Sequence, residues 1–327
     1  SGQIHMFGGP FAGLLTATGL MRDVALRTDA TFTEVTESAE KFEAFEEAML
    51  PYKRVLDLWV SRHFGNERAE DLLRDPGVDA LGAVVEEVED LDAGYREAIR
   101  QGQALWEEKR FFHWELEFPE AFINLERSDW KKNPGFDVIV GNPPYDVLAE
   151  KERQEKLQSL ISYFKFQKHY MPALGRKIDL YRLFTVLAIN LLRRQGTLGY
   201  IIPMSILADE QTFALRKYIL FNHNFIKINA FPQKDDPSRR VFPEAKLPTC
   251  IIIVRAKHTP KEKFVVTLHP GKKIEEKSGT YVASPKEISA FDKEKLKIPL
   301  LSSDLAFQLV VKLSTSENYK KMGSEVT

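Results

Sequence analysis

Four consecutive residues, Asn142, Pro143, Pro144 and Tyr145, combine side-chain types that indicate chemistry. They follow residues 136–141, an apolar run that ends in glycine and is typical of a buried strand. Ligands of open α/β sheets bind just beyond the carboxyl ends of strands. The pattern therefore predicts a carboxamide, two stiffly held carbonyls and an aromatic ring at the ligand-binding edge of a sheet.

These groups suit a reaction at the exocyclic amino group of a planar base. The nitrogen of that group is a poor nucleophile, because its lone pair is delocalised into the ring. Two acceptors aimed at its N–H bonds would free the lone pair for in-line attack on a methyl donor. The Asn142 side-chain oxygen is one such acceptor, and the carbonyl of Pro143, in a stiff loop, is the other. Tyr145 can stack on the base for about 1–3 kcal/mol, once the base has been flipped out of its duplex.

Residues 112–122 and 135–145 together resemble the gamma-type adenine-specific DNA methyltransferases, which include the fused restriction-modification polypeptides. A bare Asn-Pro-Pro also occurs in ordinary stiff turns, but the preceding strand and the second block argue against that alternative. The resemblance covers about residues 105–260. It implies transfer of a methyl group from S-adenosylmethionine to a flipped adenine of double-stranded DNA, within a restriction-modification or phage-defence protein. A cytosine amino group or a protein glutamine is a lesser variant.

The resemblance also implies a second aromatic residue that sandwiches the flipped base against Tyr145. By its position before the apolar run 249–254, Phe242 is the match. Phe231 is a rival, and the alternative for either ring is simple packing, since aromatic side chains bury large areas.

The methyl donor is expected near Asn142 and Asp179, again by resemblance. The alternative for Asp179 is a helix N-cap or first-turn acid. The family's donor site also needs a strand that ends in a Gly-rich loop. Residues 7–13 hold the one glycine cluster before the catalytic strand, without a preceding strand and with the wrong spacing. We therefore expect the upstream part of the same polypeptide to complete the donor site, which is incomplete in this chain alone and would leave it inactive by itself.

Candidate phosphate contacts lie in two basic stretches, because Lys and Arg neutralise phosphates when a protein binds DNA. The net charge of −1 limits any DNA-binding face to a local patch. For the stretch of residues 151–168, the alternative is a solvated helix surface. The candidates are Arg239, Arg240, Lys165 and Lys168, with Lys151, Arg153 and Lys156 nearby.

The fold class predicted is α/β, a partial Rossmann-like methyltransferase sheet. The 327 residues suffice for about two domains. Residues 1–110 read as a helical region, and residues 111–258 as a catalytic subdomain in which strands alternate with helices. That alternation favours a parallel sheet covered on both faces. Residues 259–327 are interpreted as the start of a DNA target-recognition region.

Other chemistries are poorly supported. The single cysteine, Cys250, lies in an apolar run and allows no disulfide within the chain, which fits a reducing cytoplasm. No apolar run approaches the roughly 18 residues of a membrane span. Asp236 with residues 244–246 mimics a nuclease metal site by chance, and His113 has no second histidine at ligand spacing, so no metal is expected.

One rival function belongs to another class. The chain would then be a non-catalytic DNA-binding or scaffold subunit, with residues 10–110 as an assembly module and a vestigial methyltransferase core. The missing Gly-rich donor loop is its best support.

Overall fold

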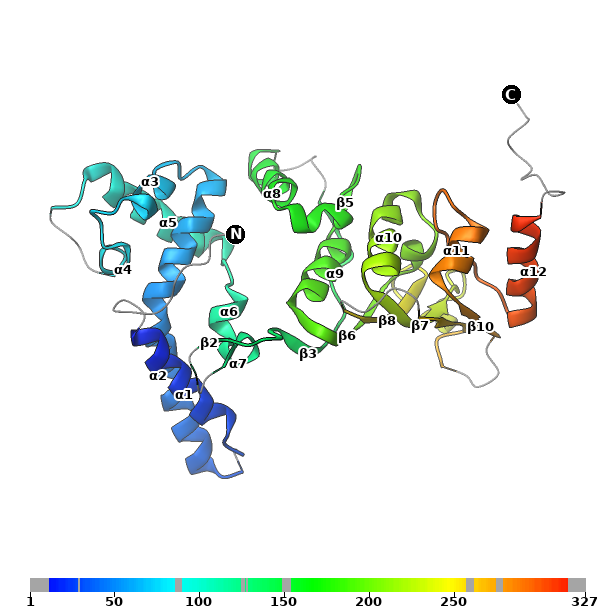
Figure 1. Ribbon diagram of the computed structural model, residues 1–327, viewed down its shortest axis with the longest axis horizontal. Helices are drawn as coiled ribbons and strands as arrows, with labels where there is room; N and C mark the ends of the chain where they lie inside the picture. Colours follow the sequence, from blue (N-terminus) through cyan, green and yellow to red (C-terminus); the bar gives the residue numbers. More distant parts are fainter. Residues whose placement is uncertain are drawn as a thin grey trace. The chain divides into compact units, whose positions relative to one another are not determined.

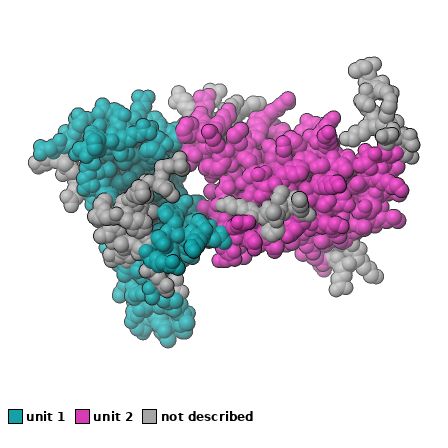
Figure 2. All heavy atoms as spheres, in the orientation of Figure 1, with its two compact units in different colours: residues 1–134 teal, residues 135–327 magenta. Residues whose placement is uncertain are grey.

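The computed structural model divides into two compact units, residues 1–134 and residues 135–327 (Figure 2). The structure describes residues 12–28, 30–85, 90–124, 127, 129–148, 154–256, 262–274 and 279–316. The second unit begins at Gly135, directly before the strand predicted to lead into the catalytic loop. The three-part division of the chain at 110 and 258 stays a prediction.

Unit 1 is helical, as its apolar periodicity predicts. Its two long helices are α2 (Phe32–Ser61) and α5 (Ala93–Lys109). A capping box starts α2, because the Thr31 hydroxyl accepts from the Glu34 backbone N–H and the Glu34 carboxylate accepts from that of Thr31. The shorter elements are α1 (Ala12–Ala25), α3 (Arg68–Arg74), α4 (Ala80–Ala83), α6 (Trp114–Glu117), α7 (Pro119–Phe122), and the antiparallel strands β1 (Ile123–Asn124) and β2 (Asp129–Trp130).

The two long helices of unit 1 approach closely at Gly102 on α5. A Cβ atom there would lie 3.1 Å from Leu58 Cδ1 and 3.5 Å from Leu58 Cα, so glycine permits the contact with α2. Leu58 is also the centre of one of two small buried clusters, with Ala69, Leu72 and Val84. Unit 1 is therefore held by local helix packing.

Unit 2 is built on a mixed six-stranded sheet with the order β10-β9-β7-β8-β6-β3, which confirms the α/β fold class (Figure 1). The pairs β3/β6 and β7/β9 are parallel, and the other three pairs are antiparallel. The strands are β3 (Phe136–Gly141), β6 (Leu192–Pro203), β7 (Asn224–Phe231), β8 (Thr249–Arg255), β9 (Phe264–Leu268) and β10 (Gly279–Ala283).

The expectation of a parallel sheet was wrong at β8. Residues 232–248, which join β7 to β8, contain one short 3-10 turn, Pro237–Arg239, and no crossover helix. A parallel return needs such a crossover. The strand therefore folds back antiparallel and inserts between β6 and β7.

Helices α9 (Leu180–Leu191) and α10 (Phe213–Asn222) pack against β6 and β7, on the same side of the sheet in Figure 1. Buried residues of α9 recur at helical spacing and those of β6 alternate, so both elements face one core. The other elements are α8 (Gln154–Phe166), α11 (Pro285–Phe291), α12 (Asp304–Thr315), and the strand pair β4 (Val147–Leu148) and β5 (Ile178–Asp179).

Strand β3 lies at one edge of this sheet. Within the described residues it pairs with β6 alone, through a register that sets Gly141 opposite Tyr200. Val138 and Val140 are 59% and 78% exposed. Strand β3, which precedes the loop of residues 142–146, thus presents both an open backbone edge and apolar side chains to solvent.

Across the described part of the chain, every helix is too short or too polar to traverse a lipid bilayer.

Candidate active site

The loop of residues 142–146 follows the carboxyl end of β3, as the sequence predicts. Two sets of backbone contacts fix its far end. Strand β4 pairs antiparallel with β5, and the Leu180 N–H donates to the Asp146 carbonyl at 2.9 Å. The loop is thereby tied to the start of helix α9, which gives it a defined path over the sheet edge.

The side chains of this loop divide between solvent and core. Asn142 is exposed and Pro143 is buried. Tyr145 is half-buried, and its hydroxyl donates to the Ile201 carbonyl of β6 at 3.1 Å. Burial raises the pKa of Tyr145 to about 12, so the hydroxyl stays a donor at neutral pH. The Asn142 side chain is accessible to a ligand, while the Tyr145 hydroxyl is held by the backbone of β6.

A glycine at the end of β3 makes room for this arrangement. A Cβ atom on Gly141 would lie 3.1 Å from Cε1 of Tyr200 on the neighbouring strand. That contact is tighter than side chains ordinarily make. Gly141 therefore allows β3 to run beside the Tyr200 ring up to the first residue of the loop.

Phe242 lies beside Tyr145, although the two are far apart in sequence. Their ring centroids are 6.3 Å apart and their planes meet at 70°, an edge-to-face contact of the kind aromatic pairs prefer. Phe242 is half-buried. The rival, Phe231, is 4% exposed and stacks on His269 with centroids 4.9 Å apart. The geometry thus favours Phe242 as the partner of Tyr145, a role that stays a prediction.

A base held between two parallel rings needs about 7 Å between them, two contacts of about 3.5 Å each. The observed separation of Tyr145 and Phe242 is slightly shorter, and the rings are tilted. A rotation of the Phe242 side chain with a small movement of its loop would open the space for a base.

Asp179 occupies the N-cap position of α9, but its side chain makes no capping hydrogen bond. Its carboxylate lies 2.7 Å from the guanidinium of Arg182, which is fully buried. Arg182 also donates to the carbonyls of Gln211 and Lys177. Asp179, next to the loop of residues 142–146, is therefore engaged in an ion pair.

Sequence reasoning missed Arg182. A charged residue within the apolar stripe of α9 was the available signal, because buried charges need partners.

The candidate DNA contacts fall into different environments. Arg240 is 4% exposed, and its guanidinium donates to the carbonyls of Lys234, Asp235 and Pro243 at 2.7, 3.3 and 2.9 Å. Its donors are thus used to shape the loop that carries Phe242, which argues against a phosphate contact.

The other candidates remain accessible. Arg239 is exposed and donates to the Pro270 carbonyl at 2.6 Å. Lys165 and Lys168 are exposed near the end of α8. Lys151 and Arg153, and the side chain of Lys156, lie outside the described residues.

Asp236 and Cys250, for which the sequence predicts no metal or disulfide role, have local structural roles. Asp236 accepts hydrogen bonds from Ser238, which lower the pKa of the carboxyl and start a short turn. Cys250 is fully buried, and burial raises the pKa of its thiol. Among the residues that the structure describes, no group of three or more His, Cys, Asp or Glu is arranged to hold a metal ion.

Comparison with known proteins identifies a family that this chain matches. The sequence model of the Eco57I restriction-modification methylase family matches residues 34–237. The type II restriction enzyme and methyltransferase RM.Eco57I of Escherichia coli is 29% identical over 132 residues, which cover 40% of this chain and 12% of that protein. The type II methyltransferase M.BstVI of Geobacillus stearothermophilus is 35% identical over 104 residues, 32% of this chain and 17% of that protein.

A third relative is the putative type II restriction enzyme and methyltransferase RM.MjaORFECS2P of Methanocaldococcus jannaschii. It is 29% identical over 161 residues, 49% of this chain and 11% of its own length. The matched part of this chain thus spans about a tenth of the length of RM.MjaORFECS2P and of RM.Eco57I. A type I restriction-modification methyltransferase subunit of Streptococcus thermophilus aligns with 17% identity and a TM-score of 0.38, over 64% of this chain and 46% of that one.

Proposed function

The chain belongs to the Eco57I restriction-modification methylase family, and from this premise we propose that it carries the catalytic loop of a DNA adenine methyltransferase. The reaction is methyl transfer from S-adenosylmethionine to the exocyclic amine of a flipped adenine in double-stranded DNA. One observation carries the proposal. The accessible carboxamide of Asn142 follows β3 directly, in the same loop as Tyr145, whose ring lies beside Phe242.

Each residue of the loop has a part in the proposed reaction. The Asn142 side-chain oxygen and the Pro143 carbonyl accept the two N–H bonds of the adenine amine, so the nitrogen lone pair points away from the ring plane. Tyr145 and Phe242 hold the base from its two faces. Pro144 keeps the loop rigid. S-adenosylmethionine, when bound, would supply the methyl group from a positively charged sulfur.

The described residues fit one flank of a donor site. The loop and the start of α9 lie together, but the Asp179 carboxylate is engaged by Arg182 and would have to share its oxygens with the donor. We propose that an upstream part of the same polypeptide supplies the other flank. The open edge of β3 and its exposed valines support this, because exposed apolar edge strands are templates for pairing.

Arg239, Lys165 and Lys168 are proposed as contacts to the DNA backbone, since each is exposed. A fully buried thiol at Cys250 fits our proposal that the protein acts in the reducing cytoplasm.

The test is methyl transfer by the complete parent polypeptide into duplex DNA, with the methylated base identified by mass spectrometry. We expect N6-methyladenine. Asn142→Ala should lower the rate by about 100-fold or more, as loss of one key transition-state hydrogen bond does, with DNA affinity within about threefold of the parent.

Asn222→Ala is the matched control, because Asn222 is an exposed asparagine at the end of α10. It should leave the rate unchanged. Near-normal methylation by Asn142→Ala would refute the assignment, and a methylated cytosine amine in place of N6-methyladenine would redirect it to cytosine.

A further inference from the structure

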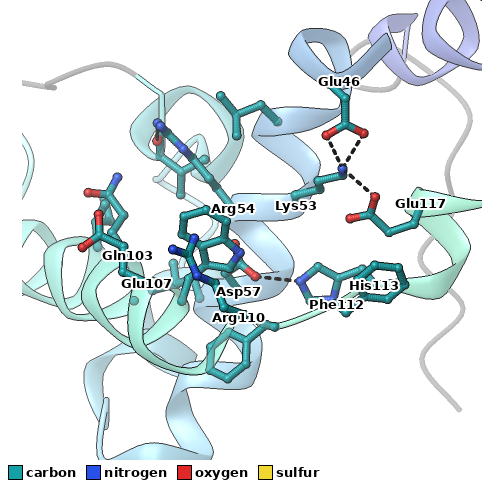
Figure 3. Close-up of a pocket in the computed structure, with 17 residues that line it drawn as sticks. Glu46, Lys53, Arg54, Asp57, Gln103, Glu107, Arg110, Phe112, His113 and Glu117 are labelled. Carbon is teal, nitrogen blue, oxygen red and sulfur yellow. Dashed lines mark hydrogen bonds and ion pairs between the residues drawn. The ribbon is translucent and has the colours of Figure 1, made fainter. Parts of the chain in front are cut away.

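Unit 1 contains a cavity of about 500 Å³ that shares no residue with the catalytic loop (Figure 3). It lies between α2, α5 and the segment 110–117, so all of its lining belongs to one unit. Its apolar floor is formed by Leu58, Val84 and Ile99. Small-molecule sites span about 300–1,000 Å³, and the cavity therefore has room for a ligand of nucleotide size.

Several charged groups of the cavity already have partners. Lys53 lies between Glu46 and Glu117, with its Nζ 2.9 Å and 3.0 Å from their carboxylates. Asp57 Oδ1 lies 2.7 Å from the Nε2 atom of His113. Lys53 offsets one of the two carboxylate charges of Glu46 and Glu117, so these pairs keep a net negative charge.

Two arginines in the cavity keep most of their donors. Arg54 donates to the Val84 carbonyl at 3.0 Å. Arg110, at the end of α5, has its guanidinium 5.0 Å from the centre of the Trp106 ring. Among the described residues, neither is within ion-pair distance of a carboxylate. A guanidinium has five N–H donors suited to the oxygens of a phosphate, so this part of the cavity is complementary to an anion.

The mouth of the cavity is aromatic, and its far wall is polar. Trp106 and Phe112 are 38% and 52% exposed, and exposed rings are platforms on which a flat base can stack. Gln103 and Glu107 lie together on α5, away from Lys53 (Figure 3). A carboxylate is the group with which proteins commonly accept ribose hydroxyls.

We propose that this cavity binds a nucleoside phosphate. The phosphate lies against Arg54 and Arg110, the ribose hydroxyls against Glu107, and the base against the rings of Trp106 and Phe112. The site is separate from the proposed methyl transfer and needs neither DNA nor a methyl donor.

The experiment is calorimetric titration of the 327-residue chain with AMP, and with adenosine and inorganic phosphate as partial ligands. We expect saturable binding of AMP, at least about tenfold tighter than either partial ligand, because each provides only part of the contacts. Arg110→Ala should weaken AMP binding about tenfold through loss of a charge-assisted contact. Phe112→Ala should weaken it as well, because the base would lose one of its two aromatic contacts.

The matched control is Arg100→Ala on the same helix, where the side chain is 71% exposed and does not line the cavity. It should bind AMP normally. The proposal is overturned if millimolar AMP gives no saturable heat, if phosphate binds as tightly as AMP, or if Arg100→Ala weakens binding as much as Arg110→Ala. It is equally overturned if S-adenosylmethionine displaces AMP, because the cavity would then belong to the donor site.

Discussion

At the scale of single residues, the tyrosine of the catalytic loop has two separable parts. Its hydroxyl is fixed by the Ile201 carbonyl, while its ring faces Phe242. Because burial raises the pKa of Tyr145 to about 12, the protonated form is favoured in the folded state. The stability from this shift is therefore complete below about pH 10, the ordinary tyrosine value, and is lost as pH rises toward 12.

Replacing Tyr145 should separate these parts. Tyr145→Phe keeps the ring and loses one hydrogen bond, so the free energy of unfolding should fall by about 1 kcal/mol with base binding preserved. Tyr145→Ala also loses the ring, and capture of a flipped base should weaken by about 1–3 kcal/mol. Fluorescence of 2-aminopurine at the target position, with the parent polypeptide, measures base capture. Equal capture by both variants would show that the ring does not touch the base.

Single residues also mark the limit of sequence reasoning at the site. Asn142, Tyr145 and Phe242 could be selected from local patterns and resemblance, and the structure brings Tyr145 and Phe242 into contact. The buried roles of Arg182 and Arg240 could not. Arg182 donates to the carbonyl of Gln211, 29 residues away, and Arg240 donates to carbonyls of its own irregular loop. No local pattern records which carbonyls will face a given guanidinium.

At the scale of elements, β3 and β6 define where the loop begins. Gly135 directly precedes β3 and has a φ of +119°, and a Cβ atom there would lie 2.5 Å from the Arg193 backbone nitrogen. Only glycine fits such a backbone conformation against another backbone. The position of the catalytic loop thus depends on a glycine at the far end of its strand.

Gly135→Ala should lower the free energy of unfolding by about 2 kcal/mol or more, measured by urea denaturation. Gly199→Ala is the matched control on β6, where a Cβ atom would make an ordinary contact of 3.8 Å with Val140. We expect that variant to stay within about 1 kcal/mol of the parent. Similar losses for both substitutions would contradict the close approach at Gly135.

The elements themselves were predicted unevenly. Helices such as α5 and α9, and strands β3, β7 and β8, follow from apolar periodicity. The two-residue strands β4 and β5 exist only through their mutual pairing, which periodicity does not encode. The reversal of β8 was missed for a related reason. Strand direction depends on whether a connection contains a crossover helix, and alternation of strands with helices elsewhere suggested one.

At the scale of the whole molecule, the open edge of β3 bears on cofactor binding. If upstream strands pair there, a longer chain should bind S-adenosylmethionine and the 327-residue chain should not. Calorimetry on the parent polypeptide and on this chain makes the comparison. If neither protein binds S-adenosylmethionine, the scaffold function is favoured. If the 327-residue chain binds it without the upstream part, the need for that part is contradicted.

A variant of the longer chain tests the edge directly. Val140→Lys, at a position 78% exposed here, should weaken binding of the donor by about tenfold or more by placing a charge where strands are proposed to pair. Val35→Lys on α2, at an exposed valine of unit 1, should leave binding unchanged. Equal affinity in both variants would mean that β3 remains uncovered in the parent polypeptide.

The tilted contact between Tyr145 and Phe242 has a consequence for how long a target stays captured. In this edge-to-face contact the edge of one ring covers a face of the other, so on the proposed function an arriving nucleobase would displace one aromatic contact and gain two. The net gain is about that of a single stacking interaction, enough to delay return of the base to its helix but too little to trap it. On the proposed function, swift departure of the base after the reaction would follow from how the empty site closes on itself.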